Sequence, residues 1–202
     1  SNKLDPFSGN LFNSMLVVNN TFDIIQSYNK RKLVPFGEFL PYENILNKFG
    51  LKKITEGHGS FLKGQDESNL IIDKLNILPL ICYEVIFPDL VQRSNENTNL
   101  IVNISEDGWF GKSIGPDQHF AKSIFRAIEN NTFLLRSTNQ GVSAIIDNKG
   151  NIVKELKRNE AGNIEFEVPL IKSNKIKNDL IFFILLITYL LFFLIYKKQN
   201  AK

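Results

Sequence analysis

Residues 77–90 read ILPLICYEVIFPDL, and the order of apolar and turn-forming residues in this stretch decides the fold. The apolar run Ile77–Ile81 predicts a buried β-strand. Pro88 predicts the start of a helix that reaches about residue 95, because the missing N–H of proline costs nothing in the first helical turn. Cys82 therefore lies at a turn between a strand and a helix.

The chain on both sides of this turn alternates strands and helices. Residues 33–42 hold two prolines and a glycine and predict a loop. The other predicted elements are a hairpin of Ser14–Val18 and Thr21–Tyr28, a short helix Glu43–Phe49, strands Leu70–Ile72, Leu100–Ile104, Phe133–Ser137, Val142–Ile146 and Asn163–Val168, and a helix Gly115–Asn131. Strands that interleave with helices are typical of an α/β layered fold.

Composition excludes several classes of protein. A chain of 202 residues predicts about one domain, and 43% hydrophobic residues exclude wholesale disorder. One cysteine excludes an internal disulfide framework, and two histidines argue against a His-rich metal site. The net charge of +3 comes from Lys197, Lys198 and Lys202, since the rest of the chain carries 21 basic and 21 acidic residues. A neutral body excludes nucleic acid as a partner on charge grounds.

The C-terminal stretch 180–196 reads LIFFILLITYLLFFLIY and carries no charge. Apolar residues occupy every face, unlike the single stripe of an amphipathic helix. At 1.5 Å per residue it spans roughly 26 Å, slightly less than the ~30 Å hydrocarbon core of a bilayer. We predict a transmembrane helix here, with a buried core helix as the alternative. Residues 171–179 are then a polar linker, and 197–202 a tail.

The thiol of Cys82 allows two interpretations. Backbone N–H groups at a strand-to-helix turn can stabilise a thiolate or an oxyanion, which favours catalysis. A single cysteine at the end of an apolar strand is otherwise a small, inert core residue. Glu84 lies two residues on, where an extended chain would return its side chain to the same side as Cys82.

Two further blocks carry polar residues that could act with a thiol. Residues 28–38 read YNKRKLVPFGE and hold Lys30, Arg31, Lys32 and Glu38. An ammonium and a carboxylate from this block could stabilise a thiolate or an oxyanion. The alternative for this block is a solvated basic turn. Residues 103–111, NISEDGWFG, hold the only tryptophan, Trp109. His119 follows the start of a predicted helix, where a cap or a structural hydrogen bond is expected.

Taken together, these three blocks resemble the apolipoprotein N-acyltransferases, a membrane branch of the nitrilase superfamily. The matching text is YNKRKLVPFGEFLP at 28–41, ICYEVIFPDL at 81–90, NISEDGWFGKSIGPDQHFAKSIFRAIENN at 103–131 and RSTNQGVSAIIDNKG at 136–150. The resemblance implies a nitrilase-like αββα sandwich, incomplete at its N-terminal side and followed by one transmembrane helix. Residues 1–170 would be the C-terminal part of that carbon-nitrogen hydrolase domain.

The resemblance also implies roles for individual residues. Cys82 would be the nucleophile and Lys30 the catalytic lysine, with no cofactor and no metal. Residues that would support them are Glu38, Tyr83 and Glu84, and Trp109 would lie in the substrate-binding loop. The implied reaction moves a fatty acyl chain from a phospholipid onto Cys82 as a thioester, and then onto the amine of a diacylglyceryl-cysteine apolipoprotein.

Two departures from the family pattern stand out. Glu106 and Gly108 occupy positions where the family usually has Asn and Ala. The family's general-base Glu lies several tens of residues before the lysine, whereas only 29 residues precede Lys30. We therefore expect this chain to be the C-terminal part of a longer protein and to be inactive by itself. The alternative is a separate chain that completes its fold with a partner.

The implied surroundings are a bacterial inner membrane, with the enzymatic body in the periplasm and residues 197–202 in the cytoplasm. Lysines flank the apolar stretch on both sides, so the positive-inside rule does not set this orientation. Two alternative functions stay open. One is a membrane-anchored amidase of the nitrilase type, and the other is an inactive, membrane-tethered interaction module.

Overall fold

The computed structural model of the chain describes residues 2–4, 9–42, 45, 48, 50, 60–65, 69–92, 97–171 and 179–199. The helix predicted over Glu43–Phe49 lies largely outside these residues. So do the end of the helix predicted after Pro88, most of the linker 171–179, and residues 200–202.

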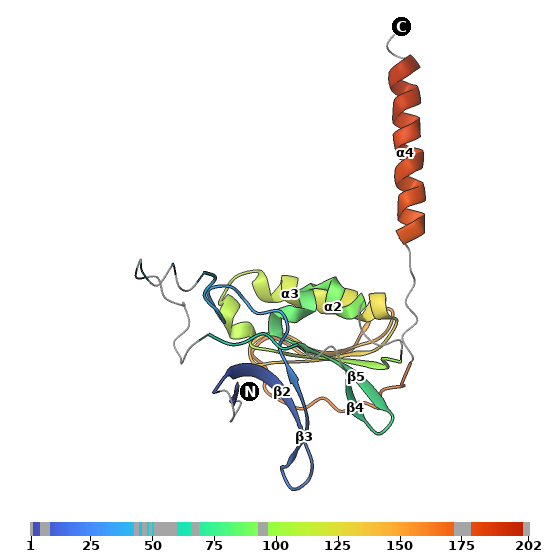
Figure 1. Cartoon of the computed structure of the whole chain (residues 1–202). Coiled ribbons are helices and arrows are strands. Elements are labelled where there is room, and N and C mark those ends of the chain that lie inside the picture. Colours follow the sequence, from blue (N-terminus) through green and yellow to red (C-terminus); the bar gives the residue numbers. More distant parts are fainter. Residues whose placement is uncertain are drawn as a thin grey trace.

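The strands form two sheets (Figure 1). The smaller sheet is antiparallel and has the order β1 (Asn2–Leu4), β2 (Leu11–Val18), β3 (Ile24–Asn29). The larger sheet has six strands in sequence order, namely β4 (Leu70–Ile72), β5 (Leu75–Ile81), β6 (Leu100–Ser105), β7 (Leu134–Thr138), β8 (Ser143–Ile146) and β9 (Ile152–Leu156). Strands β5, β6 and β7 run parallel, and their neighbours run antiparallel.

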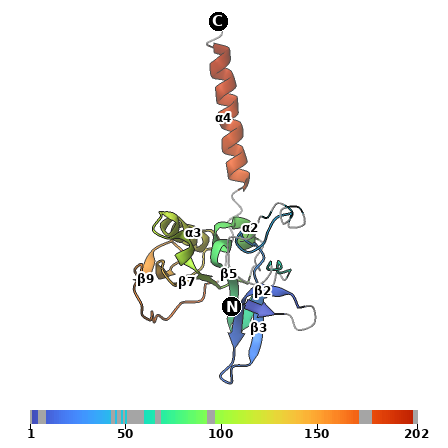
Figure 2. The same cartoon turned by 90° about the vertical axis from the view of Figure 1, so that its left-hand side faces the viewer.

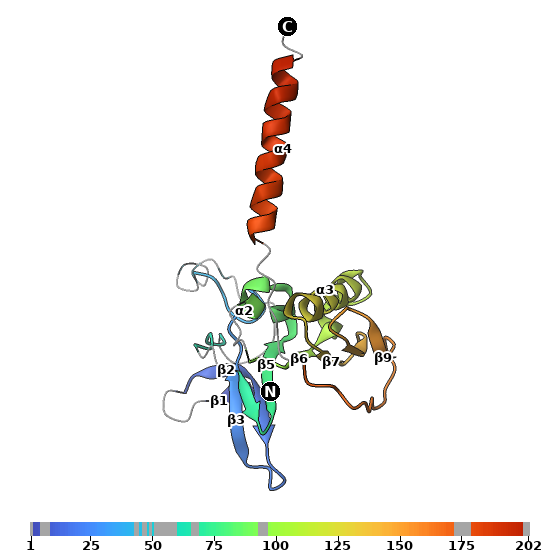
Figure 3. The ribbon, with the colours of Figure 1, turned by 90° about the vertical axis from the view of Figure 1, so that its right-hand side faces the viewer.

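The larger sheet lies between two different layers. Helices α2 (Pro88–Gln92) and α3 (Gly115–Asn130) cover one face, together with the 3₁₀ turn η2 (Cys82–Ile86). The side chains of Met15 and Tyr28, from β2 and β3, pack on the other face. Figures 1 and 3 show α2 and α3 between the sheet and α4, whereas the β2–β3 hairpin points away from α4. These are three layers of the expected αββα sandwich.

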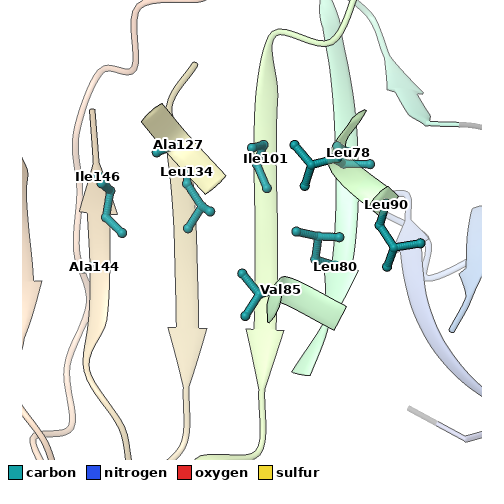
Figure 4. Close-up of a cluster of buried hydrophobic side chains, with 10 residues drawn as sticks. Leu78, Leu80, Val85, Leu90, Ile101, Ala127, Leu134, Ala144 and Ile146 are labelled. Atoms are coloured by element: carbon teal, nitrogen blue, oxygen red, sulfur yellow. The ribbon is translucent and has the colours of Figure 1, made fainter. Parts of the chain in front are cut away.

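Burial on both faces explains the apolar runs Ile77–Ile81 of β5 and Leu100–Val102 of β6. Along β5, Leu78 and Leu80 belong to the cluster under the helices, while Ile77 and Ile81 belong to the cluster between the two sheets. Figure 4 shows the first cluster, in which Leu78, Leu80 and neighbouring strands contribute side chains that face Val85 and Leu90. Fully burying such a side chain contributes roughly 1.5–3 kcal/mol to stability.

Most predicted elements are confirmed within a residue or two, and the two hairpin strands within three, but one strand is wrong. Residues Asn163–Val168 form no strand. Ile164 and Val168 pack on the cluster between the sheets, so their alternation reflects one buried face without a hydrogen-bonded partner strand. The prediction missed β1 and also β9, which pairs antiparallel with β8. The residues of β9 are largely exposed, so its sequence lacks an apolar run.

Helix α4 (Asp179–Gln199) projects away from the rest of the chain (Figure 2). Its window Ile181–Lys198 has a mean hydropathy of 2.1 and none of it is buried. By length and composition α4 can cross a membrane, and its exposure argues against the alternative of a buried core helix.

The β2–β3 hairpin exposes several large apolar side chains. Val18, Phe22, Ile24 and Ile25 are each about half exposed or more, and Phe22 reaches 84%. This exposure agrees with the expectation that the sandwich is incomplete on its N-terminal side.

Candidate active site

A cleft opens at the carboxyl ends of the three parallel strands. Strand β5 ends at Ile81, β6 at Ser105 and β7 at Thr138, and all three residues line the cleft. Its volume is about 450 Å³, and the other lining residues are Asn13, Glu38, Cys82, Ile104, Glu106, Trp109, Ser137 and Asn139. The carboxyl ends of parallel strands meet at one edge of a sheet, which is where α/β proteins bind ligands.

Cys82 follows the last residue of β5 and opens the turn η2, as predicted. The side chain is half-buried: it lines the cleft and also packs against the apolar cluster between the two sheets. The backbone at Cys82 has φ 50°, in the left-handed region that residues with a Cβ rarely adopt. This conformation costs about 1–2 kcal/mol, and it turns the chain sharply at the cleft wall.

Lys30 and Glu38 form a buried ion pair rather than a solvated turn. The Lys30 Nζ lies 2.8 Å from each Glu38 carboxylate oxygen, and the lysine side chain is 1% exposed. The Glu38 carboxylate also accepts hydrogen bonds from the Asn13 amide at 2.7 Å and from the Val34 N–H at 2.8 Å. Glu38 lines the cleft, whereas its partner Lys30 is not among the lining residues.

The position expected for Glu84 is wrong. The chain at Cys82–Ile86 is a 3₁₀ turn and not an extended segment, so the Glu84 side chain turns into the interior instead of toward the cleft. Its carboxylate accepts hydrogen bonds from four donors: the Tyr28 hydroxyl and the backbone N–H groups of Arg31, Lys32 and Ile81.

Glu84 thus ties the turn after Cys82 to the segment that carries Lys30. Burial raises the pKa of the Glu84 carboxyl, while the N–H donors oppose that rise. Burial and the neighbouring Glu84 charge also raise the pKa of the Tyr28 hydroxyl. The carboxylate acts as a structural tie and does not reach the cleft.

Tyr83 and Trp109 lie on different sides of the site. The Tyr83 ring packs edge-on against Phe87, with centroids 5.8 Å apart, and it is not among the cleft-lining residues. Trp109 belongs to the 3₁₀ turn η3 (Asp107–Phe110), lines the cleft and is 62% exposed. An exposed indole at a cleft mouth is suited to contact an apolar ligand.

The two departures from the family pattern lie beside Trp109. Glu106 lines the cleft and its carboxylate accepts a hydrogen bond from the Asn139 amide. The N–H of Gly108 donates to the Asn139 side-chain oxygen at 3.3 Å. Glu106 and Gly108 therefore both form a hydrogen bond with Asn139, which lies in the loop after β7.

Comparison with known proteins places the chain in a family. A sequence profile of the carbon-nitrogen hydrolase family matches residues 4–177. The chain belongs to the carbon-nitrogen hydrolases.

Curated relatives carry a more specific name. Proteins named apolipoprotein N-acyltransferase are 43% identical over 78% of this chain in Rhodopseudomonas palustris and 44% identical over 79% in Rickettsia prowazekii. The chain spans 30% and 32% of those two proteins, about a third of their length. These relatives confirm the resemblance that the three sequence blocks predicted.

Solved structures support the fold. The chain is similar to Nit3 of Saccharomyces cerevisiae, a member of the nitrilase superfamily, with a TM-score of 0.57 and 17% identity. The similarity covers 79% of this chain and 54% of Nit3, and it confirms the nitrilase-like fold.

A buried polar cluster lies beneath Cys82 in this carbon-nitrogen hydrolase chain. The Asp107 carboxylate is its centre: one oxygen accepts from the Ser105 hydroxyl at 2.6 Å and contacts the His119 Nδ1 at 3.0 Å, and the other accepts from Arg136 at 2.7 Å. Arg136 also donates to the side-chain oxygen of Asn103. All five side chains, which come from β6, η3, α3 and β7, therefore depend on one another.

Sequence reasoning identified only part of this cluster. A structural hydrogen bond was expected for His119 and is confirmed. Asn103, Asp107 and Arg136 were not singled out. The available signal was a charged Arg136 within a predicted strand of a two-faced sheet, since a buried guanidinium requires a partner.

We predict that the Asp107 carboxylate makes stability sensitive to acid. Burial raises the pKa of Asp107, but the His119 hydrogen bond, the Arg136 charge and the Ser105 hydrogen bond together hold it at about 2, below the ordinary 3.8. Because the pKa is lower in the folded chain, this contribution is present above pH 4 and is lost as the pH falls toward 2. Its size is about 2 kcal/mol.

The measurement compares thermal unfolding midpoints of the chain and of Asp107→Asn between pH 5 and pH 2. The variant is expected to be less stable at pH 5 and to show a flatter decline below pH 4. An equal decline in both proteins would show that Asp107 does not carry this acid sensitivity.

Proposed function

We propose that this chain supplies the nucleophile and the oxyanion-stabilising lysine of an apolipoprotein N-acyltransferase. The observation that carries the proposal is the cleft itself, in which the Cys82 side chain and the Glu38 partner of Lys30 line one cavity. The names of the relatives supply the reaction class.

The proposed reaction has two acyl-transfer steps. In the first, the Cys82 sulfur bonds to the ester carbonyl carbon of a phospholipid, the C–O bond breaks, and the thiol proton passes through a base to the departing lysophospholipid hydroxyl. In the second, the amine of a diacylglyceryl-cysteine attacks the thioester, the C–S bond breaks, and a proton from the amine restores the thiol. Thiolate suits this relay because it is both a good nucleophile and a good leaving group.

Lys30 stabilises the negative oxygen that forms in both steps. Its ammonium is almost fully buried, and a charge in a low-dielectric site acts more strongly than one in water. Glu38 fixes the position of that ammonium through two 2.8 Å contacts. Trp109, exposed at the cleft mouth, contacts the apolar part of the substrate.

The general base comes from a segment that this chain does not include. Of the carboxylates that line the cleft, Glu38 is committed to Lys30, Asn13 and Val34, and Glu106 accepts from Asn139. The family resemblance locates the base well upstream of Lys30. The chain by itself is therefore expected to be inactive.

The membrane assignment is also part of the proposal. Helix α4 would cross a bacterial inner membrane, with the cleft on the periplasmic side and Lys197 and Lys198 at the cytoplasmic end. The support is the apolar span Ile181–Lys198 and the lipid-linked substrates that the relatives' name implies. The proposed partners are a phospholipid donor and an apolipoprotein acceptor.

Acyl trapping tests the function. The complete product of the gene is incubated with a phospholipid of one defined acyl chain, and the mass of the Cys82 peptide is measured before and after hydroxylamine. We expect one acyl group on Cys82, removed by hydroxylamine and discharged by a diacylglyceryl-cysteine peptide. The present chain is expected to form no adduct under the same conditions.

Each alternative gives a different result. Release of ammonia from small amides without phospholipid dependence would favour the amidase, and no adduct from the complete gene product would favour the inactive module. An acyl adduct on the present chain alone would refute the proposal that the general base comes from another segment. The proposal that Cys82 is the nucleophile would still hold.

A further inference from the structure

The carbonyl oxygen of Cys82 points into the buried cluster and not into the cleft. It accepts a hydrogen bond from the His119 Nε2 at 3.1 Å, with a longer contact of 3.5 Å from the Asn103 amide. A carbonyl oxygen can only accept, so the Nε2 of His119 must carry a proton. The second ring nitrogen, Nδ1, faces Asp107 and Arg136 on the other side of the ring.

The His119 ring has a single well-defined orientation. Its Nδ1 lies 3.0 Å from the Asp107 carboxylate and 3.0 Å from the Arg136 guanidinium. The rings of Tyr83 and Phe110 flank it, with centroid distances of 6.4 Å and 5.3 Å. With a 3% exposed side chain and contacts on every side, His119 holds its Nε2–H in one direction.

The residue that receives this hydrogen bond is strained. Cys82 has φ 50°, and a residue with a Cβ leaves that conformation unless its surroundings enforce it. At the turn after β5, the hydrogen bond from His119 to the Cys82 carbonyl is a contact that enforces it directly. Releasing the carbonyl would let the peptide rotate and carry the thiol away from the cleft.

We propose that His119 is a positioning residue, which holds the Cys82 backbone in its left-handed turn so that the thiol faces the cleft. His119 itself does not line the cleft among the residues that the structure describes, so it acts only through Cys82. The importance of this position for acyl transfer rests on the proposed function of Cys82. The claim that His119 fixes the position of the Cys82 thiol does not rest on that function, because it concerns only where the thiol lies.

The same residue also links Cys82 to the loop of Trp109. Asp107, which contacts the His119 ring, is the first residue of η3, and Trp109 is its third. The nucleophile and the exposed indole are thereby fixed relative to each other through one imidazole. The turn η3 and the Cys82 thiol are thus held by the same residue, although no ion pair or hydrogen bond joins Trp109 to Cys82 among the described residues.

Thiol alkylation of the folded chain tests the proposal. The chain holds a single cysteine, so the intact mass after iodoacetamide treatment reports Cys82 alone. His119→Met keeps the side-chain length but has no donor, and it is expected to slow alkylation by about tenfold, as the loss of one hydrogen bond to a buried carbonyl allows. His119→Gln carries an amide N–H near the Nε2 position and is expected to stay within about twofold of the parent rate.

A matched control comes from the same helix. Ser123 is fully buried and bonds Arg136 at 3.2 Å, so Ser123→Ala disturbs the cluster without touching Cys82. We expect a parent-like alkylation rate for this variant. Thermal unfolding of all four proteins, measured alongside, ensures that the rates are compared on folded chains.

The outcomes separate positioning from general packing. An unchanged or faster rate in His119→Met, or an equal loss in His119→Met, His119→Gln and Ser123→Ala, would overturn the proposal. In the complete gene product, His119→Met is expected to lower kcat for acyl transfer and leave KM unchanged. If alkylation follows the expected pattern but no acyl group ever forms on Cys82, the proposed function fails and the positioning role stands.

Discussion

Acyl transfer by the complete gene product is expected to fall by about a thousandfold or more in Cys82→Ser, because a hydroxyl cannot replace the thiolate as nucleophile and leaving group. The substitution exchanges one atom of a half-buried side chain and leaves the turn after β5 unchanged. The free energy of unfolding is therefore expected to change by no more than about 0.5 kcal/mol. The measurements are the rate of transfer to a diacylglyceryl-cysteine peptide and the thermal midpoint of the same preparation.

Two further variants at this position form a matched pair. Cys82→Ala and Cys82→Gly both lack the thiol and are both expected to be inactive. Glycine adopts φ 50° without steric cost, so Cys82→Gly is expected to be the more stable of the two by about 1 kcal/mol. In an ordinary strand or helix the order is reversed. Retained transfer in either variant would exclude Cys82 as the nucleophile, and an alanine variant as stable as the glycine variant would mean that the strained turn is absent in solution.

Removal of the Glu84 carboxylate is expected to have the largest effect on stability. In Glu84→Ala, the backbone N–H groups of Arg31, Lys32 and Ile81 lose a buried acceptor. Unsatisfied buried donors cost about 1–3 kcal/mol each, and partial entry of water reduces the sum to about 3 kcal/mol. For a chain of this size the thermal midpoint is expected to fall by roughly 6–12 °C.

Glu84→Gln separates the hydrogen bonds from the charge. An amide oxygen can still accept from Arg31 and Lys32, while the amide nitrogen faces the Ile81 N–H, so a smaller loss of about 1 kcal/mol is expected. Removal of an exposed carboxylate, as in Glu155→Ala on β9, controls for the change in net charge. Equal stability of Glu84→Ala and Glu155→Ala would contradict the structural role of Glu84.

The central part of the fold could be predicted because its sequence signals are local. Strands β5 and β6 are buried on both faces and read as apolar runs, and α3 begins at Gly115-Pro116 and ends at Asn131 in the left-handed conformation, a residue that tolerates it. The edge strand β9 has no such run, and Asn163–Val168 has the alternation without a partner strand. Pairing between strands is a tertiary property that alternation alone does not encode.

Some features of the candidate site could be predicted from local sequence, and others depend on the folded backbone. The positions of Cys82 at a turn and of Trp109 in a loop follow from local sequence. The inward direction of Glu84 does not, because it depends on the left-handed conformation of Cys82 and on the 3₁₀ turn Cys82–Ile86 that contains Glu84. The pairing of Asp107 with Arg136 joins residues 29 positions apart and is fixed only when β6 and β7 align.

The cleft is lined by the last residues of β5, β6 and β7 and by the loops that follow them, and Glu106, Ser137 and Asn139 among these belong to neither apolar cluster. Substitutions that reshape the walls, for example at Glu106, Ser137 or Asn139, therefore fall outside the interior that sustains folding. Such a scaffold can change the ligand that its cleft accepts through substitutions at a few positions without a matching loss of stability. Evolutionary divergence and laboratory redesign of substrate choice would both begin at these strand ends.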